Sequence, residues 1–190
     1  MKLPLFVFLF LCFSSCQKGK TIKWDHVIFE KRISDQPVYQ KMNTQKEILA
    51  IYEHDTTLRR TSDVTYIIDY GSKKPVTSSK FFNCRAYYLN PEILTINIGL
   101  GSGLSGEGFI INYKDGKFYT EPYFYTDLDS ETRKESVYKV VRQTLTLDKS
   151  KYNAGDSLYG KINFHILEIN KDSIQAEHRG DGYFRTKIAK

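Results

Sequence analysis

The feature that most constrains the fold is a pair of strand-like runs between Val137 and Ile169, joined by a polar turn. In the second run one face is small or apolar and the other is polar, which is the period-two pattern of a half-buried β-strand. Its inner face is expected to hold Leu158, Gly160, Ile162, Phe164 and Ile166. The first run alternates similarly, with Val137, Val141, Leu145 and Leu147 expected inward and a break at Val140. Turn residues at 148–150 and 153–156 predict a β-hairpin with a long loop.

Shorter runs of β-branched, aromatic and alternating residues predict further strands. They cover residues 21–29, 64–70, 81–89, 93–100, 109–113, 118–126 and 183–188. Turn residues separate them, and no internal repeat is present. We therefore predict an all-β, mostly antiparallel β-sandwich of about nine strands, immunoglobulin-like or related.

A single short helix is predicted near residues 45–53. Thr44 and Glu47 have the spacing of a capping box, with Thr at the N-cap and Glu three residues later. Ile48, Ile51 and Tyr52 then follow at helical spacing. The preceding segment, residues 30–41, has the composition of a loop around Pro37.

The hairpin resembles a strand pair of macroglobulin-type and other bacterial immunoglobulin-like sandwich domains. The resemblance covers about twenty residues and follows the pattern D-K-x-x-Y-x-x-G-D. It rests on Leu147, Asp148, Lys149, Tyr152, Gly155, Asp156, Gly160, Ile162 and Phe164. It implies a sandwich fold and no particular activity.

The N-terminus has the pattern of an export signal. Met1-Lys2 is followed by an apolar run from Leu3 to Phe13 that is too short to span a bilayer. The sequence Phe13-Ser14-Ser15-Cys16 resembles the lipobox of bacterial lipoproteins. The resemblance implies a signal peptide over residues 1–15, acylation of Cys16 by chains such as palmitate, and a short tether over 16–20. Ordinary secretion is the alternative.

This resemblance also implies a cellular location. No acidic residue directly follows Cys16, which favours an outer-membrane lipoprotein facing the periplasm. A single domain over residues 21–190 is expected, since the 175 residues that remain without residues 1–15 can bury about 70% of their unfolded surface. The membrane, through the acyl chains, is thus the first predicted partner.

The number of cysteines and the spread of the charge disfavour a disulfide-stabilised fold and a nucleic-acid-binding protein. After processing, Cys84 is the only cysteine besides the acylated one, so no intrachain disulfide is possible. Cys84 is expected to be a buried structural thiol. The net charge of +6, or +5 without Lys2, is spread along the chain. No nucleic-acid site is predicted, and the charge is consistent with solubility and attraction to anionic surfaces.

The strongest predicted binding feature is a row of tyrosines. Tyr119, Tyr123 and Tyr125 share one face of the predicted strand 118–126, and Phe118 and Phe124 lie on the inner face. Such rings can stack on sugars or on an envelope protein, and the free edge of this strand could pair with a partner's strand. The glycine-rich stretch 99–108 is interpreted as a hairpin loop that could contact a ligand.

Several motifs resemble catalytic or cofactor sites but lack a necessary residue. Residues 155–162 match a phosphate-binding loop except that Ile162 replaces the required Ser or Thr. Thr132 and Tyr138 break a calcium-loop pattern that begins at Asp127. The adjacent pair Asp25-His26 would point to opposite faces of a strand. No catalytic residue, metal site or cofactor is therefore predicted.

Three functional classes remain open. The first is a membrane-anchored binding or assembly module of the cell envelope, whose ligand is an envelope protein or a glycan. The second is a toxin-neutralising immunity lipoprotein, for which an adjacent toxin gene would be the sign. The third is an envelope hydrolase, for which Asp127, Asp129 and Glu131 are the only clustered carboxylates.

Overall fold

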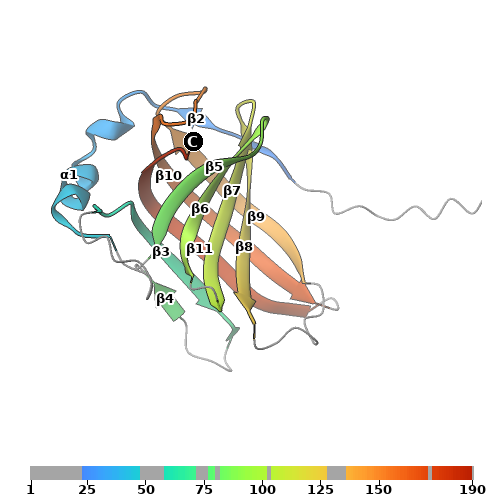
Figure 1. Cartoon of the computed structure of the whole chain (residues 1–190). Helices are drawn as coiled ribbons and strands as arrows, with labels where there is room; N and C mark the ends of the chain where they lie inside the picture. Colours follow the sequence, from blue (N-terminus) through green and yellow to red (C-terminus); the bar gives the residue numbers. More distant parts are fainter. Residues whose placement is uncertain are drawn as a thin grey trace, which may run out of the picture.

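In a computed structural model of the chain, two β-sheets pack face to face (Figure 1). The structure describes residues 23–47, 58–71, 77–79, 82–101, 104–127, 136–170 and 173–189. The predicted signal peptide, the acylation site Cys16 and the tether lie outside these residues. The predicted β-sandwich is confirmed.

The first sheet, sheet A, has five strands in the described residues, in the order β1-β8-β7-β6-β5. Their bounds are β1 Asp25–His26, β5 Asn83–Asn90, β6 Ile93–Gly101, β7 Ser105–Lys114 and β8 Lys117–Thr126. Every pair in this sheet is antiparallel, and consecutive strands are neighbours from β5 to β8. Sheet A is therefore a meander to which β1 adds a short edge strand.

The second sheet, sheet B, has six described strands in the order β2-β9-β10-β11-β3-β4. Their bounds are β2 Ile28–Phe29, β3 Ser62–Asp69, β4 Thr77–Ser79, β9 Val137–Leu147, β10 Ser157–Asn170 and β11 Ser173–Lys187. All pairs are antiparallel except β2 with β9. Because β1 and β2 are separated only by Val27, one short segment joins the edges of both sheets.

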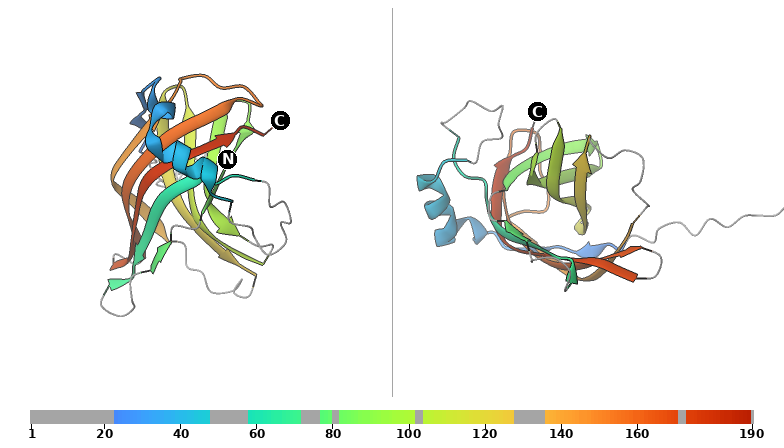
Figure 2. Two further views of the ribbon diagram at one scale, coloured as in Figure 1. Left: turned by 90° about the vertical axis from the view of Figure 1, so that its left-hand side faces the viewer. Right: turned by 90° about the horizontal axis from the view of Figure 1, so that it is seen from below.

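The core lies between the sheets and is built from the inward-facing side chains of both. Figure 2 shows the two layers from the end of the sandwich. Sheet A contributes Leu94, Ile96, Ile98, Phe109, Ile111 and Phe118, and sheet B contributes Val64, Tyr66, Leu145, Leu158, Ile162, Phe164 and Phe184. This continuous apolar layer is the main source of stability.

The predicted hairpin is present as β9 and β10, and the inward face of β10 is as expected. The inward face of β9 is correct only at Leu145 and Leu147, because Val137 and Val141 are each about half exposed, at 50% and 48%. The register shifts between His165 and Ile166, so that Val141 is an extra residue in β9. Such a bulge inverts the alternation of the residues before it.

The last strand, β11, is longer than the predicted strand 183–188. Its inward positions include Gly180, which pairs with Phe164, and Phe184 in turn pairs with Gly160. A Cβ on Gly180 would lie 2.2 Å from the Phe164 ring, and one on Gly160 would lie 2.3 Å from the Phe184 ring. Each ring therefore occupies the space that a side chain would fill on the neighbouring strand.

In the described residues the single α-helix is α1, Pro37–Thr44, so the predicted position is wrong at its start. Thr44 ends this helix, and Gln45 already has extended backbone angles. Residues 48–53 lie outside the described residues. Pro37 suits the first helical position, where the missing N–H would have had no intrahelical partner. Figure 2 shows α1 against the outer face of sheet B, where the Tyr39 hydroxyl donates to the Gly160 carbonyl at 3.0 Å.

The loop between β9 and β10 is held by its own side chains. The Asp148 carboxylate accepts hydrogen bonds from the Tyr152 hydroxyl at 2.6 Å and from the Tyr159 amide at 3.0 Å. Asp156 accepts from Lys149 Nζ at 2.9 Å and from the Asn153 amide at 3.0 Å. The residues of the D-K-x-x-Y-x-x-G-D pattern thus position one another.

The edge of β8 beside the tyrosines is partly blocked. The Thr120 amide donates to the Gln143 side chain at 3.0 Å, and Gln143 Nε2 donates to Asp25 at 3.0 Å. By strand alternation the nitrogen of Pro122 points to the same edge, where it has no hydrogen to donate. These two features disfavour the addition of a partner strand at this part of the edge.

We predict that Gly160→Ala destabilises the fold by about 1–3 kcal/mol, because the new methyl group would overlap the Phe184 ring. Urea unfolding followed by circular dichroism measures this loss. Thr144→Ala, at an exposed position of β9, is the control and should change stability little. Equal stability of the two variants would show that the ring is not confined by the glycine.

We predict a pH dependence from the Lys149–Asp156 ion pair. The hydrogen bond from Lys149, and then that from the Asn153 amide, lower the pKa of Asp156 below its ordinary value. A lowered pKa means that the stabilisation is fully present above the unfolded pKa of about 3.9 and is lost as the pH falls through the folded value. In urea unfolding, the difference between the parent protein and Asp156→Asn should be constant at pH 5–7 and should shrink below about pH 4. A difference that grows on acidification would contradict this assignment.

Candidate functional site

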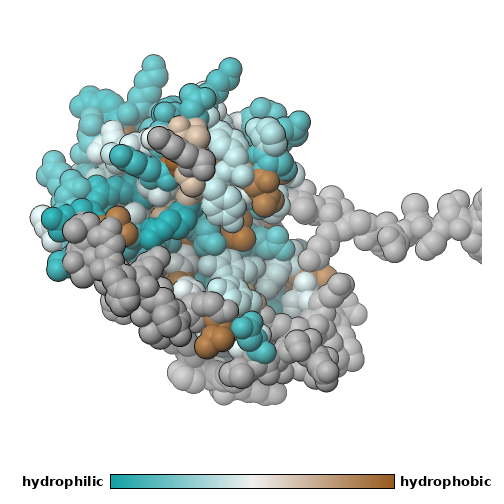
Figure 3. Space-filling view, viewed as in Figure 1, coloured by the Kyte–Doolittle hydropathy of each residue, from teal (hydrophilic) through white to brown (hydrophobic). Residues whose placement is uncertain are grey.

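The outer face of sheet A differs in chemistry from the outer face of sheet B. Between the hairpin ends it carries tyrosine, glycine, asparagine and threonine, with Arg85 and Glu121 as its charged residues in the described part of β5 to β8. In Figure 3, which looks at this face, pale colours of intermediate hydropathy occupy the middle of the surface. Sheet B instead carries ion pairs on its outer face, such as Arg179 with Glu177. The outer face of sheet A, which has few charged residues, is therefore the better candidate for ligand contact.

Two tyrosines of β8 reach across glycines on the neighbouring strands. Tyr123 pairs with Gly108, which pairs with Gly99, and a Cβ on Gly99 would lie 2.0 Å from the Tyr123 hydroxyl. Tyr125, one row further, lies over Gly106 and Gly101 in the same way. The glycines leave the space in which the phenol rings lie.

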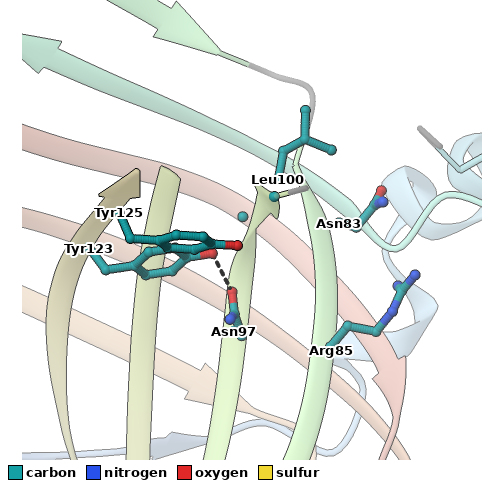
Figure 4. A pocket seen from close by; sticks show the side chains of 8 residues that line it. Asn83, Arg85, Asn97, Leu100, Tyr123 and Tyr125 are labelled. Carbon is teal, nitrogen blue, oxygen red and sulfur yellow. Dashed lines mark hydrogen bonds between the residues drawn. The ribbon is translucent and has the colours of Figure 1, made fainter. Parts of the chain in front are cut away.

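A groove of about 220 Å³ lies beyond the tyrosine hydroxyl groups. Its lining residues are Asn83, Arg85, Asn97, Gly99, Leu100, Gly101, Tyr123 and Tyr125. Figure 4 shows the two phenol rings on one side, with their hydroxyl groups pointing toward the groove, and Asn83 and Arg85 on the other side. Because the lining comes from β5, β6 and β8, the sheet itself fixes the shape of the groove.

Hydrogen bonding and stacking hold the tyrosine side of the groove. The Tyr123 hydroxyl donates to Asn97 Oδ1 at 3.0 Å. The rings of Tyr123 and Tyr125 are nearly parallel, with centroids 6.3 Å apart and planes at 18°. Burial is the main cause that raises the pKa of Tyr123 above its ordinary value, so its hydroxyl keeps its proton at neutral pH. This side of the groove is neutral and preorganised.

An ion pair between the half-exposed Arg85 and a buried carboxylate holds the opposite side. Arg85 Nη1 and Nη2 donate to the two carboxylate oxygens of Glu47 at 2.5 and 2.8 Å. The Glu47 side chain is only 1% exposed and also accepts from the Thr61 hydroxyl at 2.6 Å. Thr61 in turn accepts from the Cys84 amide at 2.9 Å. This bidentate geometry fixes the guanidinium at the groove wall.

The structure separates the three tyrosines that were predicted as a ligand-binding set. Tyr123 and Tyr125 line the groove, whereas Tyr119 packs edge-on against Trp24 with a centroid distance of 4.7 Å. Phe118 is buried as expected, as are Thr120 and Pro122 on the same face of β8, but Phe124 is 47% exposed.

The other predicted site features have definite places. The glycine-rich stretch forms the ends of β6 and β7, and its residues Gly99 and Gly101 line the groove, while residues 102–103 lie outside the described residues. Of the carboxylates considered for hydrolysis, Asp127 follows β8 directly, and Asp129 and Glu131 lie outside the described residues.

Two further predictions concern Cys84 and Asp25. Cys84 is fully buried, and this burial raises the pKa of its thiol well above its ordinary value, as expected for a structural thiol. Asp25 pairs with Lys23 at 3.3 Å and accepts from Gln143 at 3.0 Å, so it has a structural role at the edge of sheet A.

Sequence reasoning missed a polar cluster between the sheets. His178 is 5% exposed, with Nδ1 2.7 Å from the Tyr66 hydroxyl and Nε2 3.1 Å from Glu168. Nothing in the sequence indicated it, because the inward positions of β11 beside His178 are Ala176, Gly180 and Gly182, which lack the large apolar side chains that indicate the buried face of a strand. The Tyr66 hydroxyl is buried, which raises its pKa far above the ordinary value and makes it a poor nucleophile. We assign this cluster a structural role.

The groove can bind a small polar ligand through hydroxyl, amide and guanidinium groups next to an aromatic ring. Within the described ranges, no three His, Cys, Asp or Glu side chains gather closely enough to hold a metal ion. In the same part of the chain, no helix has the length and apolar character needed to cross a bilayer. Comparisons of the chain with protein-family models, curated proteins and solved structures found no match.

We predict that Glu47→Gln lowers the free energy of unfolding by about 1–2 kcal/mol, because Arg85 loses its buried charged partner. The loss is limited because the Arg85 side chain is itself partly exposed to solvent. Guanidinium unfolding followed by tryptophan fluorescence measures the change. Glu92→Gln is the matched control, because its ion pair with Lys114 is exposed and should contribute little. A similar effect of both substitutions would show that burial of the Glu47 pair is unimportant.

Proposed function

We propose that this chain is an exported, membrane-anchored lipoprotein that acts as a binding module in the cell envelope, and that the groove on the outer face of sheet A is its ligand site. The observation that carries this proposal is the groove itself. It combines two nearly parallel tyrosines, which lie over glycines of the sheet, with an arginine that an ion pair fixes. Such preorganised polar and aromatic groups favour binding, because little side-chain freedom is lost when a ligand arrives.

The membrane anchor rests on the sequence. The lipobox-like Phe13-Ser14-Ser15-Cys16 supports acylation at Cys16, and acyl chains hold a domain at a membrane without a spanning helix. Outer-membrane attachment facing the periplasm is part of the proposal. The six residues between Cys16 and Lys23 would allow the domain to stand at most roughly 20–25 Å from the anchor. The ligand would therefore belong to the envelope.

We predict that the lipidated protein, crosslinked in intact cell envelopes and then captured by affinity, retains a discrete envelope component. Mass spectrometry and sugar analysis identify what is recovered. Tyr125→Ala should lose this component because it removes the most exposed aromatic ring of the groove. The melting temperature should change little, since this ring is 44% exposed.

Two control variants test whether the capture depends on the groove and whether the membrane attachment depends on Cys16. Phe124→Ala removes an aromatic ring that is equally exposed, at 47%, but lies on the opposite face of β8, so capture should persist. Cys16→Ala tests the anchor, because the protein should then leave the membrane fraction while the groove stays intact. Capture that survives Tyr125→Ala, or that is lost equally with Phe124→Ala, would refute the groove as the ligand site.

A further inference from the structure

The side chains that line the groove carry no net charge once their partners are counted. Arg85 is the charged residue among them, and both of its terminal nitrogens bind the Glu47 carboxylate. That carboxylate is almost fully buried and receives a further hydrogen bond from Thr61. An anionic ligand at this wall would meet a guanidinium whose charge is already compensated, and it would be repelled by Glu47. Charge complementarity therefore disfavours carboxylates and phosphates here.

The polar groups of the groove match those of sugar hydroxyls. A tyrosine hydroxyl can donate and accept, and an asparagine side chain has both a donor and an acceptor group. Tyr123, Tyr125 and Asn97 bring these groups to one side of the groove, and Asn83 brings another amide to the other side. A ligand with several hydroxyl groups also donates and accepts at every position. Such a set of groups suits a saccharide better than a hydrocarbon ligand.

The size and lining of the groove set the extent of the ligand. A volume of about 220 Å³ is below the roughly 300–1,000 Å³ of pockets for drug-sized ligands, so about one ring fits. The Tyr123 and Tyr125 hydroxyls cover Gly99 and Gly101, so that the groove available to a ligand begins at these hydroxyl groups. The exposed part of the Tyr125 ring offers an aromatic surface next to it.

From these observations we infer that the groove binds a single neutral saccharide ring and discriminates against the corresponding anionic sugar. This inference rests on the proposed function, because it names the ligand class of the same groove. Arg85 takes part as a hydrogen-bond donor whose charge Glu47 compensates, and Glu47 is the residue that determines the preference for a neutral ligand.

Isothermal titration calorimetry with matched pairs of sugars tests the inference. The probes are the methyl glycosides of glucose, galactose and mannose, each with its uronic acid, so that each pair differs only in the oxidation state of one carbon. At least one neutral glycoside should bind with a dissociation constant on the order of 1 mM, as expected for a small ligand. Its uronic acid should bind at least about fivefold more weakly.

Single-residue variants show where the glycoside binds and which residue causes discrimination against the uronic acid. Tyr125→Phe removes one hydroxyl group at the groove and should weaken the neutral glycoside about fivefold. Tyr119→Phe removes a hydroxyl group on the same face of β8 but outside the groove, and should leave binding unchanged. Glu47→Gln should shift the affinity ratio toward the uronic acid by at least about threefold, because Arg85 then lacks its anionic partner. Circular dichroism confirms that each variant is folded.

The outcomes separate this inference from the proposed function. Tighter binding of the uronic acid by the parent protein would overturn the inferred neutrality. An absence of binding by every sugar, with capture of the envelope component still dependent on Tyr125, would overturn the saccharide class while the groove remains the ligand site. An affinity ratio that does not change in folded Glu47→Gln would overturn the role of Glu47.

Discussion

The structure depends on aromatic rings that occupy the space left by glycines on neighbouring strands. Inside the sandwich, Phe164 and Phe184 cover Gly180 and Gly160 in paired rows of β10 and β11. On the outer face of sheet A the same arrangement places Tyr123 and Tyr125 over glycines of β6 and β7. A ring fixed in this way has few alternative rotamers, because the backbone lies beneath it and neighbouring rows lie beside it. The same packing of aromatic rings over glycines is therefore present in the core and on one side of the groove.

The groove lies where the row of tyrosine rings over glycines ends. The tyrosine rings reach as far as Gly99 and Gly101 on β6, and the next strand, β5, presents Asn83 and Arg85 instead of another aromatic residue. The space between the phenol hydroxyls and these side chains stays open. On the far side Glu47 fixes Arg85 and compensates its charge. The result is a rigid, polar and neutral site, and these properties favour recognition of an uncharged ligand.

The sandwich, most of its strands and the inward face of β10 could be predicted from alternation, because burial on one face of a strand requires it. The single strand predicted over residues 21–29 was wrong, since the chain divides at Val27 into β1 and β2 of different sheets, and β4 was not predicted. The start of the predicted helix at residue 45 was wrong and α1 was not predicted, since the capping-box pattern at Thr44 to Glu47 is local, whereas Tyr39 and Met42 of α1 are stabilised by distant contacts. The predicted inward face of β9 was wrong before residue 142, because the break noted at Val140 was not interpreted as a bulge that inverts the alternation. Tyr123 and Tyr125 were found by their spacing, but Asn97, Arg85 and Glu47 were not, because cross-strand register brings them together from separate segments.

The most direct test of the central claim, that this groove is the ligand site, is an NMR titration of the isotopically labelled protein with the neutral methyl glycosides. The side-chain amide signals of Asn83 and Asn97 report from opposite walls of the groove, and that of Asn112 reports from the same face outside it. Saturable shifts of the Asn83 and Asn97 signals, with Asn112 unchanged, are the predicted result. Saturable shifts confined to other parts of the molecule would place the ligand elsewhere and contradict the account.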